Sequence, residues 1–345
     1  MSRNLKFYKN KNVLITGGAS FIGSHLTELI LQSGSNVRII DDLSSGKKEN
    51  LSSVINEINF YEGDVRNTDT LFPLLKNIDV VFNLAAMHGG RGYIETHPVE
   101  CLNNMLLDHT LFEAAVRSNV ESIVHASSAC VYPTNLQDDE DDRYLLAESD
   151  ANFEEPGKAF SDGEYGWAKL MGELQLKAFN KQYGVNGIAA RIFTAYGERE
   201  NESHAAIALI AKALLKIDPY PIWGNGQQTR NFTYVKDTVM GLAFAGTLNN
   251  GFDTLNIGSS NHYTIQDLCN IIFDYYDWKP NEFDFQLDKP VGVKSRASDN
   301  SKIKSFFNWE PTIGLKEGIE KTAKWYKENI NNEKLDDLEK ILMER

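Results

Sequence analysis

The chain has 345 residues, of which 42% are apolar, and this length accommodates one large domain or two closely packed ones. Its 48 acidic residues outnumber its 35 lysines and arginines. The resulting formal net charge of −13 disfavours nucleic acid and anionic membranes as partners. The chain has no run of 18 apolar residues, and its three cysteines are too widely spaced for a disulfide framework or a zinc site. We therefore expect a cytoplasmic protein that holds no metal.

The first half of the chain alternates between strand-like and helical segments. A short apolar run at 12–16 leads through a glycine-rich turn into a helical pattern that ends near Gly34. Further strand-like runs lie at 36–41, 58–64, 79–86, 122–128 and 187–193, and the clearest helical stretches span 99–118 and 164–183. This alternation predicts an α/β fold with a Rossmann-like, doubly wound parallel sheet, in which ligands bind at the carboxyl ends of the strands.

The alternation weakens after about residue 194, where aromatic residues and prolines become frequent. Residues 231–258 return to the earlier pattern. We therefore predict a sheet domain formed by residues 1–193 and about 231–258. The remaining residues, 194–230 and 259–345, are expected to form a smaller α/β domain.

The stretch VLITGGASFIGSH at 13–25 has the form of a dinucleotide-binding loop. Gly17 would make the tight turn after the strand, and Gly23 would let the following helix pack closely on it. Ser20 stands where a third, central glycine is usual, and its hydroxyl could donate a hydrogen bond to a phosphate. The pattern predicts a loop that still holds a dinucleotide.

Acidic residues end the second and third predicted strands. Asp41 lies 18 residues beyond Gly23, where a carboxylate can accept both ribose hydroxyls of the adenosine. The same carboxylate would repel a 2′-phosphate, which favours NAD over NADP as the cofactor. Asp64 and Val65 follow the third strand and are expected to frame the adenine.

The sequence YGWAK places Tyr165 and Lys169 one helical turn apart on the same face. A lysine near a tyrosine lowers the pKa of the phenol, and the phenolate can take a proton from an alcohol as a hydride leaves. Ser128, at the end of the fifth predicted strand, is placed to share that hydrogen bond. These three residues are the predicted catalytic group.

Taken in order, the segments GGASFIG, DDLSSG, GDVRN, NLAA, SSACVYP, YGWAK, WGNGQQTRNFTYVKD and NWEPTIGLKEGI resemble the extended short-chain dehydrogenase/reductases. Among these, they are similar to the nucleotide-sugar epimerases and dehydratases, from about residue 10 to 327. The resemblance implies a homodimer and a tightly held NAD that is reduced and reoxidised within one turnover. It also implies that the smaller domain binds the nucleotide sugar.

The resemblance also extends the list of expected contacts. It implies that Leu84, Ala85 and Ala86 lie along the cofactor, with Asn104 behind the site, and that Arg230 and Arg296 bind the diphosphate. The full expected cofactor site is Gly17, Ser20, Phe21, Ile22, Gly23, Asp41, Ser45, Gly46, Asp64, Val65, Leu84, Ala85, Ala86, Asn104, Tyr165 and Lys169. The expected substrate site is Gly90, Arg91, Thr194, Arg230 and Arg296, with Thr194 at a place where these enzymes often carry asparagine.

Two stretches, AAMHGGRGYIETHPVE and SSACVYP, resemble the GDP-mannose 3,5-epimerases. In that group, the cysteine matching Cys130 is an acid/base beside the sugar, because a ketone at C4 makes the protons on C3 and C5 acidic. The second acid/base is a lysine there, whereas the nearest residue here is His204. Histidine can exchange protons near neutral pH. The alternatives are that Cys130 only lines the pocket and that His204 faces water at the start of a helix.

Other activities remain open at this point. A 4-epimerase of UDP- or GDP-hexoses needs only Ser128, Tyr165 and Lys169. A 4-dehydrogenase or dehydratase is a further alternative, although dehydratases usually carry an Asp-Glu pair where this chain has Ala129 and Cys130. A non-catalytic nucleotide sensor would keep the loop without turnover.

Overall fold

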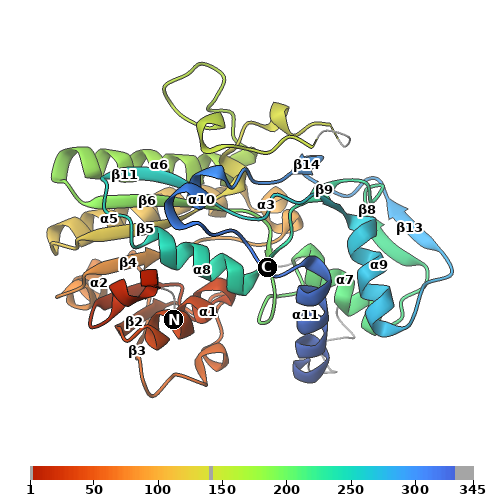
Figure 1. Ribbon diagram of the computed structural model, residues 1–345, viewed down its shortest axis with the longest axis horizontal. Helices are drawn as coiled ribbons and strands as arrows, with labels where there is room; N and C mark the ends of the chain where they lie inside the picture. The colour runs from red at the N-terminus through yellow and green to blue at the C-terminus, as the bar shows by residue number, and fades with distance from the viewer. Residues whose placement is uncertain (1–2, 140–142, 331–345) are drawn as a thin grey trace.

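The computed structural model describes residues 3–139 and 143–330 and is built around a seven-stranded sheet (Figure 1). The strand order is β11-β6-β5-β4-β1-β2-β3, and every pair in it is parallel. The bounds are β1 (Asn12–Thr16), β2 (Asn36–Asp41), β3 (Asn59–Glu62), β4 (Val80–Asn83), β5 (Ser122–Ser128), β6 (Asn186–Ile192) and β11 (Phe252–Ile257). The prediction of a Rossmann-like α/β fold with a doubly wound parallel sheet is confirmed.

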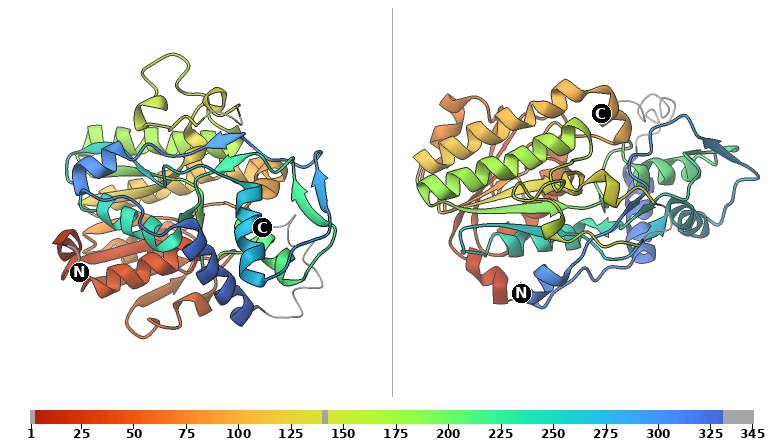
Figure 2. Two further views of the ribbon diagram at one scale, coloured as in Figure 1. Left: turned by 45° about the vertical axis from the view of Figure 1, so that its right-hand side comes forward. Right: turned by 90° about the horizontal axis from the view of Figure 1, so that it is seen from above.

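Helices cover both faces of this sheet (Figures 1 and 2). One face carries α1 (Phe21–Gln32) and α8 (Val235–Ala245); the other carries α2 (Thr68–Leu75), α5 (Asn104–Arg117) and α6 (Gly163–Tyr183). Side chains of a strand point alternately to the two faces. Val13 and Ile15 accordingly pack in the core beneath α1 and α8, and Leu14 packs in the core beneath α5 and α6. Burial on both sides explains why β1 reads as an unbroken apolar run.

The helical stretch predicted at 99–118 is two helices in the structure. α4 (Pro98–Leu102) and α5 are separated at Asn103. The buried side-chain amide of Asn104 donates a hydrogen bond of 2.9 Å to the carbonyl of Cys101 at this break. The short helix α3 (Arg91–Thr96) precedes them.

The remaining elements form a smaller layer beside the sheet. α7 (Ala205–Leu214), α9 (Ile265–Tyr276) and α11 (Leu315–Asn329) pack together. Three short strands form a second sheet in the order β12-β9-β14, and two parallel pairs, β8–β13 and β7–β10, complete the layer. Their bounds are β7 (Ala195–Tyr196), β8 (Tyr220–Trp223), β9 (Thr229–Arg230), β10 (Thr233–Tyr234), β12 (Tyr263–Thr264), β13 (Phe283–Gln286) and β14 (Ser295–Arg296).

Two details bear on the predicted domain boundaries, which stay a prediction. The stretch 231–258 supplies α8 and β11 to the large sheet. In contrast, α10 (Ser301–Phe307) packs against β11, although its residues were assigned to the smaller domain. Short 3-10 helices lie at Arg3–Tyr8, Lys48–Leu51, Ala129–Val131, Thr134–Leu136 and Glu148–Asp150.

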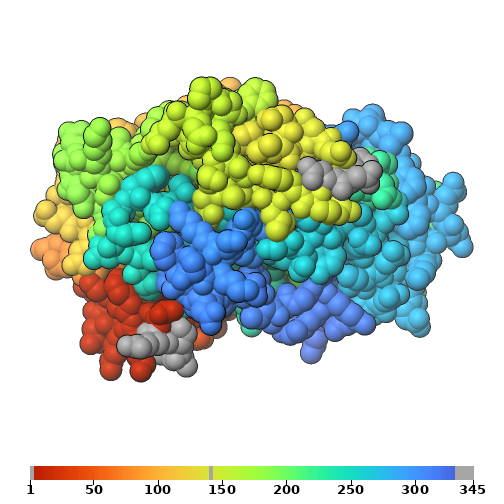
Figure 3. All heavy atoms as spheres, turned by 45° about the horizontal axis from the view of Figure 1, so that its top comes forward, coloured from red at the N-terminus to blue at the C-terminus, as the bar shows by residue number. Residues whose placement is uncertain are grey.

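A long connection after β5 ties the two layers together. The backbone N–H of Leu146 donates to the carbonyl of Ala297 at 3.0 Å, and the side chain of Asn256 donates to the carbonyl of Leu146 at 2.8 Å. In Figure 3, this yellow-green segment lies against the blue C-terminal part of the chain. None of the helices in the described part of the chain combines the length and apolarity needed to cross a bilayer.

Candidate active site

The glycine-rich loop between β1 and α1 depends on two residues without side chains. Gly17 has a φ of +67°, and a Cβ there would lie 3.0 Å from the backbone nitrogen of Ala85. A Cβ on Gly23 would lie only 2.1 Å from the carbonyl oxygen of Gly17. Glycine therefore allows both the turn and the close approach of α1, as the sequence predicted.

Ser20 does not need the conformational freedom of glycine. Its φ is −75° and its ψ is 177°, which any residue adopts, and it is the N-cap of α1. Its hydroxyl accepts a hydrogen bond from the backbone N–H of Gly23 at 3.3 Å and donates to the carbonyl of Gly17 at 2.6 Å. Serine therefore stabilises the loop through both contacts, and a contact of its hydroxyl with a phosphate stays a prediction.

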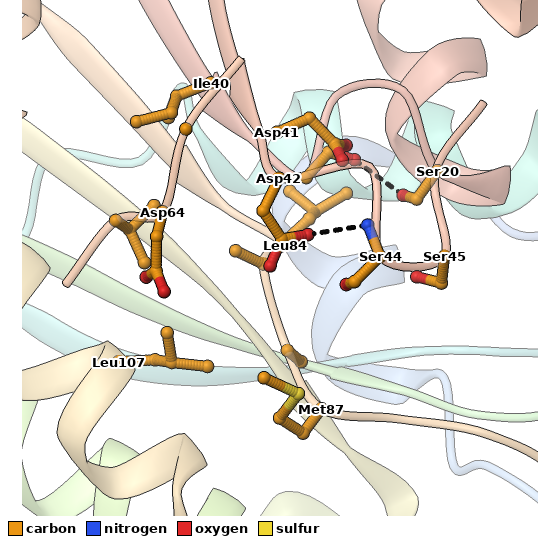
Figure 4. Close-up of a pocket in the computed structure, with 15 residues that line it drawn as sticks. Ser20, Ile40, Asp41, Asp42, Ser44, Ser45, Asp64, Leu84, Met87 and Leu107 are labelled. Atoms are coloured by element: carbon orange, nitrogen blue, oxygen red, sulfur yellow. Dashed lines mark hydrogen bonds between the residues drawn. The ribbon is translucent and has the colours of Figure 1, made fainter. Parts of the chain in front are cut away.

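A cleft opens at the carboxyl ends of β1, β2 and β4 (Figure 4). Of the predicted cofactor contacts, Gly17, Ser20, Asp41, Ser45, Asp64, Val65, Leu84, Ala85 and Ala86 line it. Phe21, Ile22, Gly23, Gly46, Asn104, Tyr165 and Lys169 do not line this cleft. The cleft is the part of the expected cofactor site that would surround the adenosine.

Asp41 is buried and organises the backbone at the edge of the cleft. Its carboxylate accepts hydrogen bonds from the backbone N–H groups of Ala19 and Leu43, each at 2.9 Å. A Cβ on Gly46 would lie 2.7 Å from the same carboxylate, so glycine is required there. The place of Asp41 at the edge of the cleft is the one expected for a carboxylate that binds ribose hydroxyls.

Asp64 lies across the cleft from Asp41, next to Val65. The guanidinium of Arg66 donates from Nε to both oxygens of Asp64, at 3.0 and 2.9 Å. This hydrogen bonding lowers the pKa of the Asp64 carboxyl, so the group stays ionised. Two fixed carboxylates beside a glycine loop and a helix N-terminus suit a dinucleotide without a 2′-phosphate. The described residues therefore fit NAD.

Asn104 positions the wall of the cleft from behind. Its Oδ1 accepts from the backbone N–H of Met87 at 2.7 Å, and its Nδ2 donates to the Met87 carbonyl at 3.0 Å. The hydroxyl of Thr16 similarly accepts from the backbone N–H groups of Leu84 and Ala85, at 3.1 and 3.0 Å. The backbone of residues 84–87 is thus held at both ends.

Tyr165, Lys169 and Ser128 come together at the carboxyl end of β5, where the N-terminal end of α6 lies. Lys169 Nζ is 5.9 Å from the centre of the Tyr165 ring and donates to the carbonyl of Ala126 at 2.9 Å. Tyr165 is 5% exposed and Lys169 is 2% exposed, so both groups are held away from solvent. The side chains of residues 165 and 169 therefore meet beside Ser128 and do not point into solvent.

The pKa values of these groups differ from our expectation. Burial raises the pKa of Tyr165 well above its ordinary value, and a hydrogen bond with Ser128 opposes the rise only in part. Burial also lowers the pKa of Lys169. Desolvation therefore sets the direction of the phenol pKa in this structure, and the lowering that the sequence suggested for Lys169 is not seen.

Cys130 follows Ser128 and lies in a small cluster with Tyr165. Arg296 Nη1 donates to Cys130 Sγ at 3.3 Å, and its Nη2 donates to Asp162 at 3.1 Å. Asp162 also accepts from Arg91 Nη1, at 3.0 Å. Asp162 was missed by the sequence analysis; its only signal was its place three residues before Tyr165, at the start of α6.

Arg230 is paired in register with Arg296 on the neighbouring strands β9 and β14. Its guanidinium donates to the carbonyls of Thr229 and Val291, at 2.7 and 2.8 Å. Burial, together with the charge of Arg296, lowers the pKa of Arg230 to about 9. Arg230 is half-buried and Arg296 is buried, so neither is an ordinary surface arginine. Two adjacent guanidiniums of this kind are suited to a diphosphate.

His204 lies at the start of α7, and its ring contacts that of His88, which in turn lies next to Tyr165. The rings of His88 and His204 stack with centres 5.1 Å apart, and the ring of His88 lies 5.4 Å from that of Tyr165. About a quarter of the His204 side chain is accessible, and desolvation lowers its pKa to about 4. His88 was missed, although it lies within the glycine-rich stretch MHGG that drew attention.

Gly90 allows the loop before α3 to meet the segment before α7. A Cβ on Gly90 would lie 1.8 Å from the carbonyl oxygen of Ser203. Thr194 takes part through its backbone, since its carbonyl accepts from the N–H of Thr233 at 2.8 Å. Their contacts with substrate stay a prediction.

Comparisons with known proteins agree with this geometry. The chain matches the model of the NAD dependent epimerase/dehydratase family over residues 13–258. It is 33% identical to GDP-mannose 3,5-epimerase 1 of Oryza sativa subsp. indica, over 93% of this chain and 83% of that protein. It is also similar to two solved structures. One is UDP-glucose 4-epimerase with UDP-glucose from Thermotoga maritima, with a TM-score of 0.81 and 25% identity over 93% of this chain and all of that one. The other is MoeE5 in complex with UDP-glucuronic acid and NAD, with a TM-score of 0.79 and 29% identity over 92% and 100% of the two chains.

Proposed function

Because the chain belongs to the NAD-dependent epimerase/dehydratase family and is an NAD-dependent enzyme, we propose that it epimerises a nucleotide-diphosphate hexose. In this proposal the sugar is oxidised at C4, protons are exchanged at C3 or C5, and C4 is reduced again. One observation carries the proposal: Cys130 and Tyr165 pack together in one site. Arg296 donates a hydrogen bond to Cys130 there. The relative named above favours a GDP-sugar.

The redox step uses Tyr165 as the base that takes the proton of the C4 hydroxyl. Ser128 shares a hydrogen bond with the phenol, and Lys169 Nζ lies one helical turn away, 5.9 Å from the centre of the phenol ring. Bound NAD would accept and return the hydride, and its charged nicotinamide ring would lower the pKa of a neighbouring phenol. The raised pKa of Tyr165 is then the property of the site before that charge is added.

The proton exchange uses Cys130 and His204 as acid and base. The guanidinium of Arg296 donates a hydrogen bond to Cys130 Sγ at 3.3 Å and so fixes the position of the sulfur in the site. His204 is neutral near pH 7 because its pKa is lowered to about 4, so it can accept a proton. A ketone at C4 makes the neighbouring C–H groups acidic enough for such bases.

Arg230 and Arg296 are the proposed diphosphate contacts. Their side chains stem from adjacent strands at paired positions, which suits a forked contact with phosphate oxygens. Arg91 adds a third guanidinium, which Asp162 holds in place. This local positive charge is what an acidic protein needs in order to hold an anionic substrate.

A 4-epimerase is the second candidate, supported by the likeness to UDP-glucose 4-epimerase over almost the full length of both chains. It would use Tyr165, Ser128 and Lys169 without Cys130 or His204. The two candidates differ in one measurable property, since only the first exchanges carbon-bound hydrogen with solvent.

The test is incubation of the purified protein in heavy water with GDP-, UDP-, dTDP- and CDP-hexoses, followed by mass spectrometry. We expect deuterium on carbon with a GDP-hexose. Cys130→Ser should abolish this incorporation but keep oxidation at C4, whereas the control Cys269→Ala, in the remote helix α9, should behave like the wild type. A changed sugar without carbon-bound deuterium would support the 4-epimerase instead.

We also propose that the protein is a homodimer. Val99 on α4 and Leu106 on α5 are 68% and 54% exposed, which is unusual for aliphatic side chains on neighbouring helices. Light scattering of the wild type and of Leu106→Glu would test this: a monomeric mass for the wild type would contradict it. A cytoplasmic location stays a prediction.

A further inference from the structure

The segment between β7 and α7 carries a buried acid beside His204. The side chain of Glu200 is 3% exposed, and its Oε1 lies 3.7 Å from His204 Nδ1. Among the described residues, Glu200 Oε2 has no hydrogen-bond partner. A buried carboxyl with an unused oxygen next to an imidazole calls for a role that the overall fold does not explain.

Asn201 defines which ring nitrogen of His204 carries the proton. Its Oδ1 lies 3.0 Å from the backbone nitrogen of Ser203, and a backbone N–H can only donate. The atom at this position must therefore be the amide oxygen, which can only accept. The same oxygen also accepts from the hydroxyl of Ser203 and is 3.2 Å from His204 Nδ1. This favours the hydrogen on Nδ1, because an unprotonated Nδ1 would face the oxygen with a lone pair. Neutral His204 then has an unprotonated Nε2.

We propose that Asn201 and Glu200 are positioning residues that hold His204 as the Nδ1–H tautomer, so that Nε2 takes the proton from the sugar carbon. This inference rests on the proposed function and deepens it. In the step, the C–H bond next to the C4 ketone breaks and its electron pair forms the enolate. The proton forms a bond to Nε2. The Cys130 thiol returns a proton to that carbon from the other face and becomes the thiolate.

Glu200 acts on the second half of this step. When Nε2 takes the proton, His204 becomes an imidazolium, and Glu200 turns a carboxyl oxygen toward that ring at 3.7 Å. Burial raises the pKa of the Glu200 carboxyl well above its usual value, so it is the dipole of this carboxyl that faces the new charge. The other groups that face His204 are His88, whose ring stacks on it, and Asn201. The neighbouring Glu202 is engaged by the hydroxyl of Tyr326, at 3.2 Å. Glu200 is thus the acid placed to respond to the charge of the ring.

The first experiment reads the tautomer directly, without turnover. Two-dimensional nitrogen-15 NMR of the labelled full-length protein near neutral pH distinguishes Nδ1–H from Nε2–H. We expect the Nδ1–H form in the wild type and in Asn201→Asp, which keeps the acceptor oxygen, and its loss in Asn201→Leu. The matched control is Asn225→Leu, because Asn225 makes the same contact with the N–H two residues on, in another loop. An Nε2–H tautomer in the wild type would overturn the inference.

The second experiment measures deuterium incorporation into the sugar. Asn201→Leu should slow it by about 100-fold, the lower end of what a positioned acid–base group contributes, and Asn201→Asp should restore most of it. Glu200→Gln should slow incorporation while leaving the Nδ1–H tautomer in place. Wild-type incorporation in both Asn201→Leu and Glu200→Gln would refute the roles given to them. If the wild type incorporates no deuterium with any sugar, the proposed function fails, whereas the NMR result still decides the tautomer.

Discussion

Gly90→Ala offers a sharp test of the site because its effect is purely steric. Gly90 has a φ of −65°, which alanine adopts without strain. The added Cβ would, however, lie 1.8 Å from the carbonyl oxygen of Ser203, and real Cβ atoms do not approach closer than 3.0 Å. The segment that carries His204 must therefore move by about 1 Å or more, and a shift of about that size can slow a positioned reaction about 100-fold.

The assay is deuterium incorporation from heavy water, measured together with cofactor reduction in a single turnover. We expect incorporation to fall about 100-fold in Gly90→Ala, because His204 is displaced from the sugar. Gly314→Ala is the matched control, since a Cβ there meets no atom within 4 Å. Wild-type incorporation in Gly90→Ala, with the fold intact, would show that the position of the His204 segment does not limit exchange.

Three further predictions concern the redox group, the loop and the pH response. Tyr165→Phe should slow hydride transfer by about 10²–10⁴-fold, because the phenol proton path is lost; near-normal turnover in stopped-flow measurements would overturn its role. Gly23→Ala should lower the free energy of unfolding by about 1–3 kcal/mol and weaken NAD binding in calorimetry, because its Cβ would lie 2.1 Å from the Gly17 carbonyl oxygen. Burial lowers the pKa of His204 from 6.5 to about 4, so the unfolded chain binds more protons between these values and stability falls as the pH falls through this range. His204→Gln should lose less stability than the wild type as the pH falls from about 7 to 5. An equal fall in melting temperature in the wild type and the variant would contradict this.

The layout of the sheet could be predicted because each strand has a local signature. The runs at 12–16, 36–41 and 122–128 have the same bounds as β1, β2 and β5, since strands buried on both faces are continuous apolar runs bordered by turn residues. The return of the chain at 231–258 was likewise visible before β11 and α8 were seen. The periodicity of apolar residues did not show the break between α4 and α5 at Asn103. At this break the side chain of Asn104 donates a hydrogen bond to the carbonyl of Cys101, and such a contact leaves no periodic pattern.

The candidate site was less accessible to sequence reasoning, for reasons of distance and burial. The partners of Asp162 are Arg91 and Arg296, which lie far from it along the chain, so no spacing rule reveals the pair. His88 becomes notable only when the fold stacks its ring on His204 and brings it next to the ring of Tyr165. The predicted lowering of the Tyr165 pKa was wrong because burial, which a sequence does not show, raises it.

The ion pairs of Asp162 have a consequence for how substrate binding is driven. Immobilising a long, flexible side chain at an interface costs about 0.5–1.5 kcal/mol in conformational entropy. Asp162 restrains Arg91 and Arg296 when the protein folds, so a phosphate that arrives later meets guanidiniums that have already lost this freedom. Calorimetry of Asp162→Asn should therefore show a larger entropic penalty for binding the nucleotide sugar, even though one competing negative charge has been removed.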